Sequence, residues 1–280
     1  MKFKALFFIF LFPLFAYAQS PWTPGKGKQY HQLSFTTVPA YDKLFVNVGE
    51  FELERFVTDN TLQYYGEIGL SNHFSLTAII PLKLLKSGDL SSETPTLPIF
   101  PSGNFTALGN VQLAAKYNFY NINDFAFSAS MQVGTPSDAN QKDTGLRSGF
   151  DAWSLSPSLS AGVNKEKFYS YSFLAYSWYS NEFASYIHFG IEAGAKLNKG
   201  LIIAIQISTL QTLTDGTYIP SEINLRSGLY LNGYEYTAFL IKVIKDLIPN
   251  KFGINGSLGG GTGNLVAQSP ALTFGAYFKL

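Results

Sequence analysis

Residues 187–197 read IHFGIEAGAKL, and apolar residues alternate with polar or small ones along the whole stretch. Ile187, Phe189 and Ile191 fall on one side of this alternation, whereas His188 and Glu192 fall on the other. Successive side chains of a β-strand point to opposite faces, so a period of two with one apolar face predicts a strand with one apolar and one polar side. The stretch is also long enough for a tilted strand to cross a bilayer.

The same alternation recurs along the chain. We predict about twelve such strands, within a range of about 10 to 14, near residues 30–39, 60–70, 73–85, 106–119, 125–135, 152–164, 167–179, 186–197, 201–212, 233–245, 251–260 and 270–280. Short turns alternate with long links between these strands, which is typical of outer-membrane barrels whose short turns are periplasmic. The pair Asn232-Gly233 favours a two-residue hairpin, so the link at 213–232 could hold one extra strand above the membrane.

The composition supports a membrane barrel. Only 14% of the 280 residues are charged and 16% are aromatic, whereas an ordinary soluble domain has about 25% charged residues. After residue 18 the chain contains no uncharged apolar run long enough for a membrane helix. Because backbone groups in lipid must pair within the protein, a closed barrel is the remaining spanning structure. We therefore expect an all-β, transmembrane, antiparallel up-and-down barrel with both termini periplasmic.

The first residues predict secretion. Lys2 and Lys4 precede the apolar run Ala5–Phe15, which is followed by Ala16-Tyr17-Ala18. This pattern is that of a cleaved signal peptide, and the run is too short to span a bilayer. We expect a signal peptide at residues 1–18, a barrel domain at 19–280 and a location in the Gram-negative outer membrane. Only residues 19–29 precede the first strand, too few for a substantial plug.

Strand parity places a set of charged side chains inside the barrel. The candidate lumen-facing residues are Glu67, Lys83, Lys116, His188, Glu192, Lys196 and Lys242. Such a polar wall suits a water-filled channel, although the same side chains could interlock into a filled core. The set leans cationic, which favours anionic or polar solutes. We expect no catalytic, metal or cofactor-binding residues, and the absence of cysteine excludes disulfides and thiolate metal sites.

Three motifs carry a family resemblance. They are residues 21–27 (PWTPGKG), residues 65–76 (YGEIGLSNHFSL) followed by Pro81-Leu82, and residues 108–117 (LGNVQLAAKY). Together they resemble the phenol-degradation meta-pathway family of outer-membrane barrels, relatives of porin-like and hydrophobic-compound transporters. The resemblance implies uptake of aromatic compounds. Where the family usually has Gly-Asp, this chain has Gly109-Asn110.

These observations predict a passive pore or diffusion transporter for small solutes, with hydrophobic or aromatic compounds among the candidates. We expect a monomer, inserted among outer-membrane lipids by the barrel-assembly machinery, without a nucleic-acid partner because 20 basic and 19 acidic residues nearly balance. The solute itself is unknown. One alternative is a membrane-embedded lipid hydrolase, for which His188 would be the base, although no Gly-x-Ser-x-Gly motif occurs. Another is a structural or adhesion barrel that acts through its extracellular loops.

Overall fold

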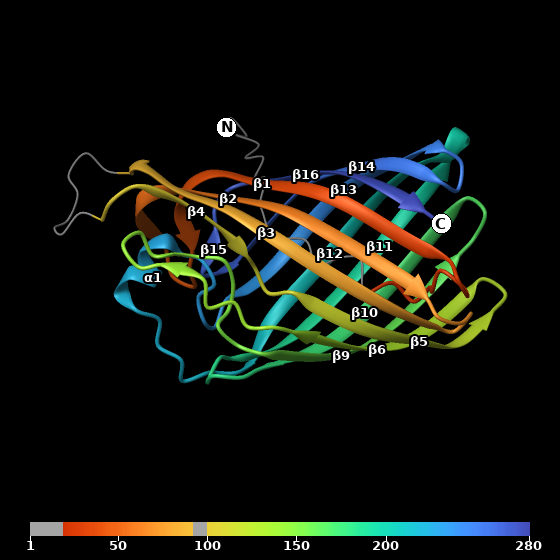
Figure 1. The fold of residues 1–280 in the computed structure, drawn as a ribbon, viewed down its shortest axis with the longest axis horizontal. Helices are drawn as coiled ribbons and strands as arrows, with labels where there is room; N and C mark the ends of the chain where they lie inside the picture. Colours follow the sequence, from red (N-terminus) through yellow and green to blue (C-terminus); the bar gives the residue numbers. More distant parts are fainter. Residues whose placement is uncertain (1–18, 92–99) are drawn as a thin grey trace, which may run out of the picture.

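The computed structural model describes residues 19–91 and 100–280 (Figure 1). The expected signal peptide, residues 1–18, lies outside the described residues. Within them the chain forms strands and two short helical segments. Their bounds are β1 (Gln29–Phe45), β2 (Glu50–Gly69), β3 (Phe74–Leu90), β4 (Gly103–Leu108), β5 (Gln112–Ile122), β6 (Phe125–Gly134), β7 (Asn140–Gln141), β8 (Leu146–Arg147), β9 (Ser154–Asn164), β10 (Phe168–Tyr179), β11 (Ser185–Leu197), η1 (Asn198–Gly200), β12 (Leu201–Thr214), α1 (Glu222–Ser227), β13 (Glu235–Ile248), β14 (Phe252–Asn264), β15 (Val266–Ala267) and β16 (Ala271–Lys279).

The strands close into a barrel. β1 pairs antiparallel with β2 on one side and with β16 on the other, so the sheet has no open edge. β4 and β5 both pair with β3 and are two parts of one wall strand. Counted in this way, the wall is a closed antiparallel barrel of twelve strands, which confirms the predicted fold. Within the described residues, no helix is both long and apolar enough to cross a membrane.

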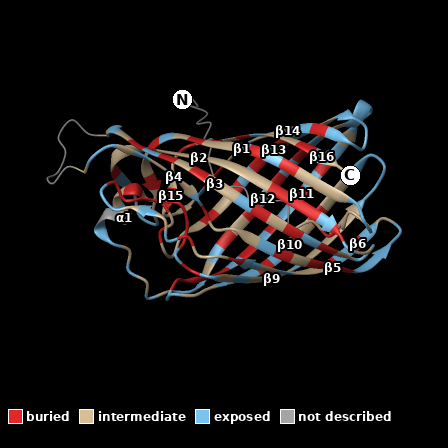
Figure 2. Ribbon diagram, viewed as in Figure 1, coloured by how far each residue is buried: buried red, intermediate tan, exposed pale blue. Residues whose placement is uncertain are grey.

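The two ends of the barrel differ. Tight turns close one end, where the backbones of Gln29 and Leu280 also hydrogen-bond to each other, so the first and last strands end there. We call this the short-turn end; α1, β7, β8 and β15 lie at the opposite, loop end (Figure 1). Along β11, Ile187, Phe189 and Ile191 are exposed on the outside, whereas His188 and Glu192 are buried. Figure 2 shows this alternation on many strands, as expected for a wall between lipid and lumen.

Two links differ from the sequence-based expectation. Strands β1, β2 and β3 are 17, 20 and 17 residues long, well beyond the roughly 9–11 residues that span a bilayer. Most of the expected 40–59 link is therefore strand, because its apolar residues pack against the loops. The proposed extra hairpin at 213–232 is wrong. That link contains α1, which begins after Ser221, whose hydroxyl accepts from the Asn224 N–H, and ends at Gly228 with a positive φ of 65°.

Candidate functional site in the barrel interior

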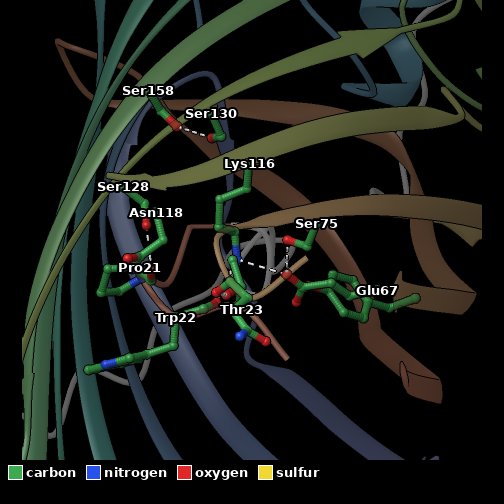
Figure 3. Close-up of polar contacts among 12 residues, drawn as sticks. Pro21, Trp22, Thr23, Glu67, Ser75, Lys116, Asn118, Ser128, Ser130 and Ser158 are labelled. Carbon is green, nitrogen blue, oxygen red and sulfur yellow. Dashed lines mark hydrogen bonds and ion pairs between the residues drawn. The ribbon is translucent and has the colours of Figure 1, made fainter. Parts of the chain in front are cut away.

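A buried ion pair bridges β5 and β2 across the inward face of β3, near the short-turn end. The Nζ atom of Lys116 on β5 lies 3.1 Å from Oε1 of Glu67 on β2, and both residues are buried. The same carboxylate accepts hydrogen bonds from the Ser75 hydroxyl at 2.7 Å and from the Tyr65 hydroxyl at 3.0 Å (Figure 3). A buried carboxylate is tolerated when its charge and its lone pairs are satisfied, as they are here. This pair forms a polar platform inside the wall.

The residues before β1 fold back into the barrel onto this platform. Lys116 Nζ donates to the carbonyl of Trp22 at 3.1 Å, and Asn118 Nδ2 donates to the carbonyl of Pro21 at 2.8 Å. Ser128 also donates to Pro21, which is fully buried (Figure 3). The expectation that this segment is too short to act as a plug is therefore wrong. Backbone carbonyls of this segment, which has no regular secondary structure, accept hydrogen bonds from the inward faces of β5 and β6, so even a short segment can occupy part of the lumen.

Aromatic rings hold the other side of the same segment. The Trp22 ring lies edge-on to Tyr169 and Tyr171 of β10, with centroids 6.3 and 5.9 Å apart. The Gly162 Cα lies beneath Pro21 and Trp22, where an added Cβ would come within 2.9 Å of both side chains. We call residues 19–24 the N-terminal plug. The signal that could have revealed it is the Pro-Trp-Thr-Pro motif, which has one aromatic anchor between two residues that cannot donate backbone hydrogen bonds.

Each of the three deeply buried lysines has a carboxylate partner. Lys242 Nζ lies 2.5 Å from Glu192, which also accepts from Tyr169 and Tyr171 at 2.8 and 3.2 Å. Lys83 Nζ lies 2.6 Å from Asp59. Sequence reasoning missed Asp59, although it shares the inward parity of Gln63 and Glu67, because the strand was expected to begin at residue 60. With these three pairs the lumen has no cationic excess at these positions.

The remaining two predicted lumen residues lie apart from these pairs. His188 is buried near the loop-side start of β11, with Nδ1 3.4 Å from the Gln19 amide and Nε2 3.4 Å from the Tyr236 hydroxyl. Its ring nitrogens thus face an amide and a phenol, whereas a hydrolase would need a serine nucleophile there. Lys196 lies half-buried at the short-turn end, where its Nζ donates to Asn164 and to the Lys165 carbonyl. Neither residue joins the platform under the plug.

A cavity of about 180 Å³ lies farther toward the loop end. Its roof comes from the loop that precedes β13 and from neighbouring aromatic residues, and its floor comes from polar side chains of the wall. The roof includes Phe150, Tyr179, Leu229, Tyr230, Leu231 and Tyr234, and the floor includes Asp59, Thr61, Gln63, Lys83 and Gln112. The Lys83 ammonium lies 5.6 Å from the centroid of the Tyr230 ring. Burial raises the pKa of Tyr230, so its phenol keeps the proton it can donate.

The wall is interrupted beside this cavity, between β4 and β5. The Asn110 amide nitrogen donates to the carbonyls of Thr135 and Phe150, both at 2.7 Å, and its oxygen accepts from the Phe150 N–H at 2.8 Å. In the described sheet β4 pairs only with β3, while β6 and β9 end at this level. Segment 135–153 closes the wall here through side-chain contacts. An aspartate could not donate to the two carbonyls, so asparagine suits this position.

Comparisons with known proteins agree with this architecture. The fold of this chain is similar to that of the COG4313 outer-membrane channel from Pseudomonas putida F1. The two chains share 15% identity and superpose with a TM-score of 0.67 over 91% of this chain and 96% of that chain. The NanC porin matches with 10% identity and a TM-score of 0.53 over 90% of this chain and all of that chain. The β domain of the Bordetella autotransporter BrkA matches with 11% identity and a TM-score of 0.51, over 91% and 100%.

At such identities these likenesses concern the fold alone. No curated protein matches the chain in sequence. A family model described as "Putative MetA-pathway of phenol degradation" matches residues 37–278, which is most of the chain. The match agrees with the resemblance carried by the three sequence motifs. This chain is therefore a closed β-barrel with an apolar outer face, and it belongs to the family described as "Putative MetA-pathway of phenol degradation".

Proposed function

We propose that this protein is a passive channel for small amphipathic solutes, aromatic compounds among them. The observation that carries the proposal is the cavity with an aromatic roof and a polar floor. Apolar pockets of about 150 Å³ can hold a benzene ring, so a cavity of about 180 Å³ suits one aromatic ring. Polar floor groups such as Lys83 and Thr61 would receive its hydroxyl or carboxylate. The phenol-degradation description of the family supports the same class of solute.

In this proposal the plug and the loop before β13 are the two gates of the path. The plug is held mainly by hydrogen bonds that wall side chains donate to the carbonyls of Pro21 and Trp22. A solute or water could replace these hydrogen bonds one by one. Leu229 and Leu231 close the loop end by burial rather than by strand pairing. Both closures use contacts that can be exchanged without opening the wall. The candidate residues Glu67, Lys116, Glu192 and Lys242 would then line the path as neutral pairs.

Reconstitution into planar bilayers tests the proposal. We expect discrete conductance steps from the full barrel and a larger or more persistent open state after deletion of residues 19–24. Vesicles that contain the barrel should admit phenol or benzoate faster than empty vesicles do. Charge reversal at the exposed turn residue Glu166 serves as the matched control, because it alters a charge outside the lumen. A barrel that is folded by its heat-modifiable gel migration but passes neither ions nor solutes would reject the channel.

We also propose that the short-turn end is periplasmic, as in other barrels with this loop asymmetry. A single cysteine at Asp138, in the loop between β6 and β9, should react with a membrane-impermeant maleimide on intact cells. The same substitution at Lys199, in the turn between β11 and β12, should react only after the outer membrane is permeabilised. Labelling of the Lys199 site on intact cells would reverse the orientation.

A further inference from the structure

Charge is distributed unevenly along the barrel axis. Nine lysines lie at the short-turn end, against three acidic side chains, Asp124, Glu166 and Asp246, so the described side chains at this end carry a net formal charge of +6. We call these lysines the basic rim: Lys26, Lys28, Lys165, Lys167, Lys196, Lys199, Lys245, Lys251 and Lys279. The interior pairs contribute no net charge. The whole-chain charge of +1 therefore conceals a strong separation of sign.

The loop end carries the opposite sign. Its described residues contain six basic and twelve acidic side chains, for a net formal charge of −6. The basic ones are Lys43, Arg55, Lys86, Lys142, Arg147 and Arg226, and the acidic ones are Asp42, Glu50, Glu52, Glu54, Asp89, Asp138, Asp143, Asp151, Glu182, Asp215, Glu222 and Glu235. A random placement of these 30 charged side chains would not be expected to give such a division. The two ends therefore face surroundings with different charge preferences.

Part of the basic rim is neutralised locally. Lys165 pairs with Asp124 at 3.3 Å, and Lys279 with Asp246 at 3.6 Å. Lys196 and Lys245 donate to turn carbonyls. Lys167, Lys199 and Lys251 are exposed, and no carboxylate among the described residues lies within ion-pair distance of them. Lys26 and Lys28 are also exposed and have no ion pair among the described residues, but they precede β1, whereas Lys167, Lys199 and Lys251 lie in turns between wall strands.

The same three lysines border the apolar outer face of the barrel. Phe168 directly follows Lys167, and Phe252 directly follows Lys251; both rings are exposed on the wall. Lys199 lies two residues after Leu197, which is also exposed. Lysines beside a lipid-facing band extend their ammonium groups to the headgroup level while their methylenes stay against apolar surface. The plug occupies part of the lumen mouth at this end, and the hollow beside Trp22 is lined by Asp246 and Lys279 but not by these three lysines.

We propose that the basic rim binds the headgroups of anionic phospholipids, with Lys167, Lys199 and Lys251 as the main contacts. Phosphodiester groups at the membrane surface supply the negative charge that these lysines lack within the protein. A juxtamembrane lysine gains a modest free energy from such a surface, and several together give a clear selectivity. The identity of the leaflet, the inner one, rests on the proposed orientation. The lipid selectivity itself does not depend on whether the barrel conducts.

The test counts lipids that stay bound to the purified full-length barrel. The barrel is placed in nanodiscs of phosphatidylcholine and phosphatidylglycerol at about nine to one, released gently and examined by native mass spectrometry. We expect bound phosphatidylglycerol to be enriched over its share of the mixture. The triple variant Lys167→Gln, Lys199→Gln, Lys251→Gln should lower this enrichment by about fivefold or more. The control variant Lys43→Gln, Lys86→Gln, Lys142→Gln removes as many charges from the loop end and should retain it.

Several outcomes would overturn the proposal. Equal enrichment in the wild type and the rim variant, or none in either, means that the rim does not select lipid. Rim-dependent binding of soluble polyphosphate in detergent, without phosphatidylglycerol enrichment, would identify a soluble polyanion as the partner instead. Loss of enrichment at high salt would agree with the proposal, because exposed charges are screened. Unchanged conductance in the rim variant keeps this result separate from the channel test.

Discussion

The two halves of the barrel interior are built by opposite rules. Near the loop end, buried apolar side chains from β1, β2 and β3 pack against the loops, and Leu44 and Leu53 are almost completely buried. Near the short-turn end, many buried side chains are charged or polar, and they hydrogen-bond to one another and to the plug. The interior of the loop-end half resembles the core of a soluble protein. In the short-turn half the arrangement is reversed, with polar side chains inside the barrel and apolar side chains on its outer face.

The surroundings of each half explain the difference. The long ends of β1 to β3 extend beyond the length that a bilayer covers. In water they can be held only by burying apolar surface, as in any soluble domain. Toward the short-turn end, lipid surrounds the wall, so its apolar side chains face outward and its polar side chains must find hydrogen-bond partners inside. We call the loop-end half of the barrel the outer half and the short-turn half the inner half. Stability should therefore depend on burial of apolar side chains in the outer half and on completed hydrogen bonds in the inner half.

The largest effect is expected where an inner ion pair is broken. Glu192→Gln leaves the buried Lys242 without its carboxylate and removes the strongest acceptor for Tyr169 and Tyr171. Breaking a buried pair on one side costs about 3–5 kcal/mol, and we expect a loss in that range in the free energy of unfolding, measured by urea titration of the barrel in vesicles. The exposed Glu166→Gln should change it by less than about 0.5 kcal/mol.

This expectation revises one that strand parity alone would give. Ile191→Arg on the lipid face should cost about 2–4 kcal/mol near the bilayer midplane, and a lumen-facing Glu192→Gln would seem far cheaper by parity. Because three donors surround Glu192, the two substitutions should instead destabilise the barrel to a similar extent. A cost below about 1 kcal/mol for Glu192→Gln would mean that water readily replaces the pair and that the inner half is solvated.

The outer half should respond to a cavity instead. Leu44→Ala removes a fully buried side chain from the apolar cluster at the loop end. Leu→Ala in a packed core costs about 2–5 kcal/mol, and we expect the unfolding free energy to fall in that range. Leu213→Ala, at an exposed position near the end of β12, is the control and should cost much less. Similar small costs at both positions would show that the outer cluster is loosely packed.

The fold could be predicted from the sequence because a spanning strand has a repeating signal. Residues 187–197 alternate in sequence and in burial, and their limits nearly coincide with those of β11. For the interior, the sequence could predict only which side chains point inward. Parity placed Glu192 and Lys242 on inward faces, but which carboxylate meets which lysine depends on barrel register, which joins residues 50 positions apart. The plug and α1 carry no periodic signal, since neither spans the membrane.

A smaller effect is expected at the interruption of the wall. Asn110→Asp places carboxylate oxygens against the carbonyls of Thr135 and Phe150, which now accept from the Asn110 amide. Leaving buried acceptors unsatisfied costs about 1–3 kcal/mol. We expect a loss of that size, together with faster proteolysis within segment 135–153. Asn140→Asp, at an exposed position in the same segment, is the matched control. No difference between the two variants would mean that segment 135–153 is held by other contacts.

The smallest effect on stability should accompany a change in conduction. Trp22→Ala removes the ring that lies between Tyr169 and Tyr171, and each such aromatic contact contributes about 0.5–1.5 kcal/mol. The plug contributes no residue to the wall strands, so this loss should shift its docking equilibrium and leave unfolding of the wall almost unchanged. A weakening of about 1.4 kcal/mol corresponds to a tenfold rise in the undocked fraction.

Single-channel recordings should therefore show longer open periods in Trp22→Ala, whereas Trp178→Ala, on the outer face, should behave as the wild type. Identical recordings from all three proteins would mean that the plug does not control the path, and that the polar platform beneath it serves only to hold the wall together.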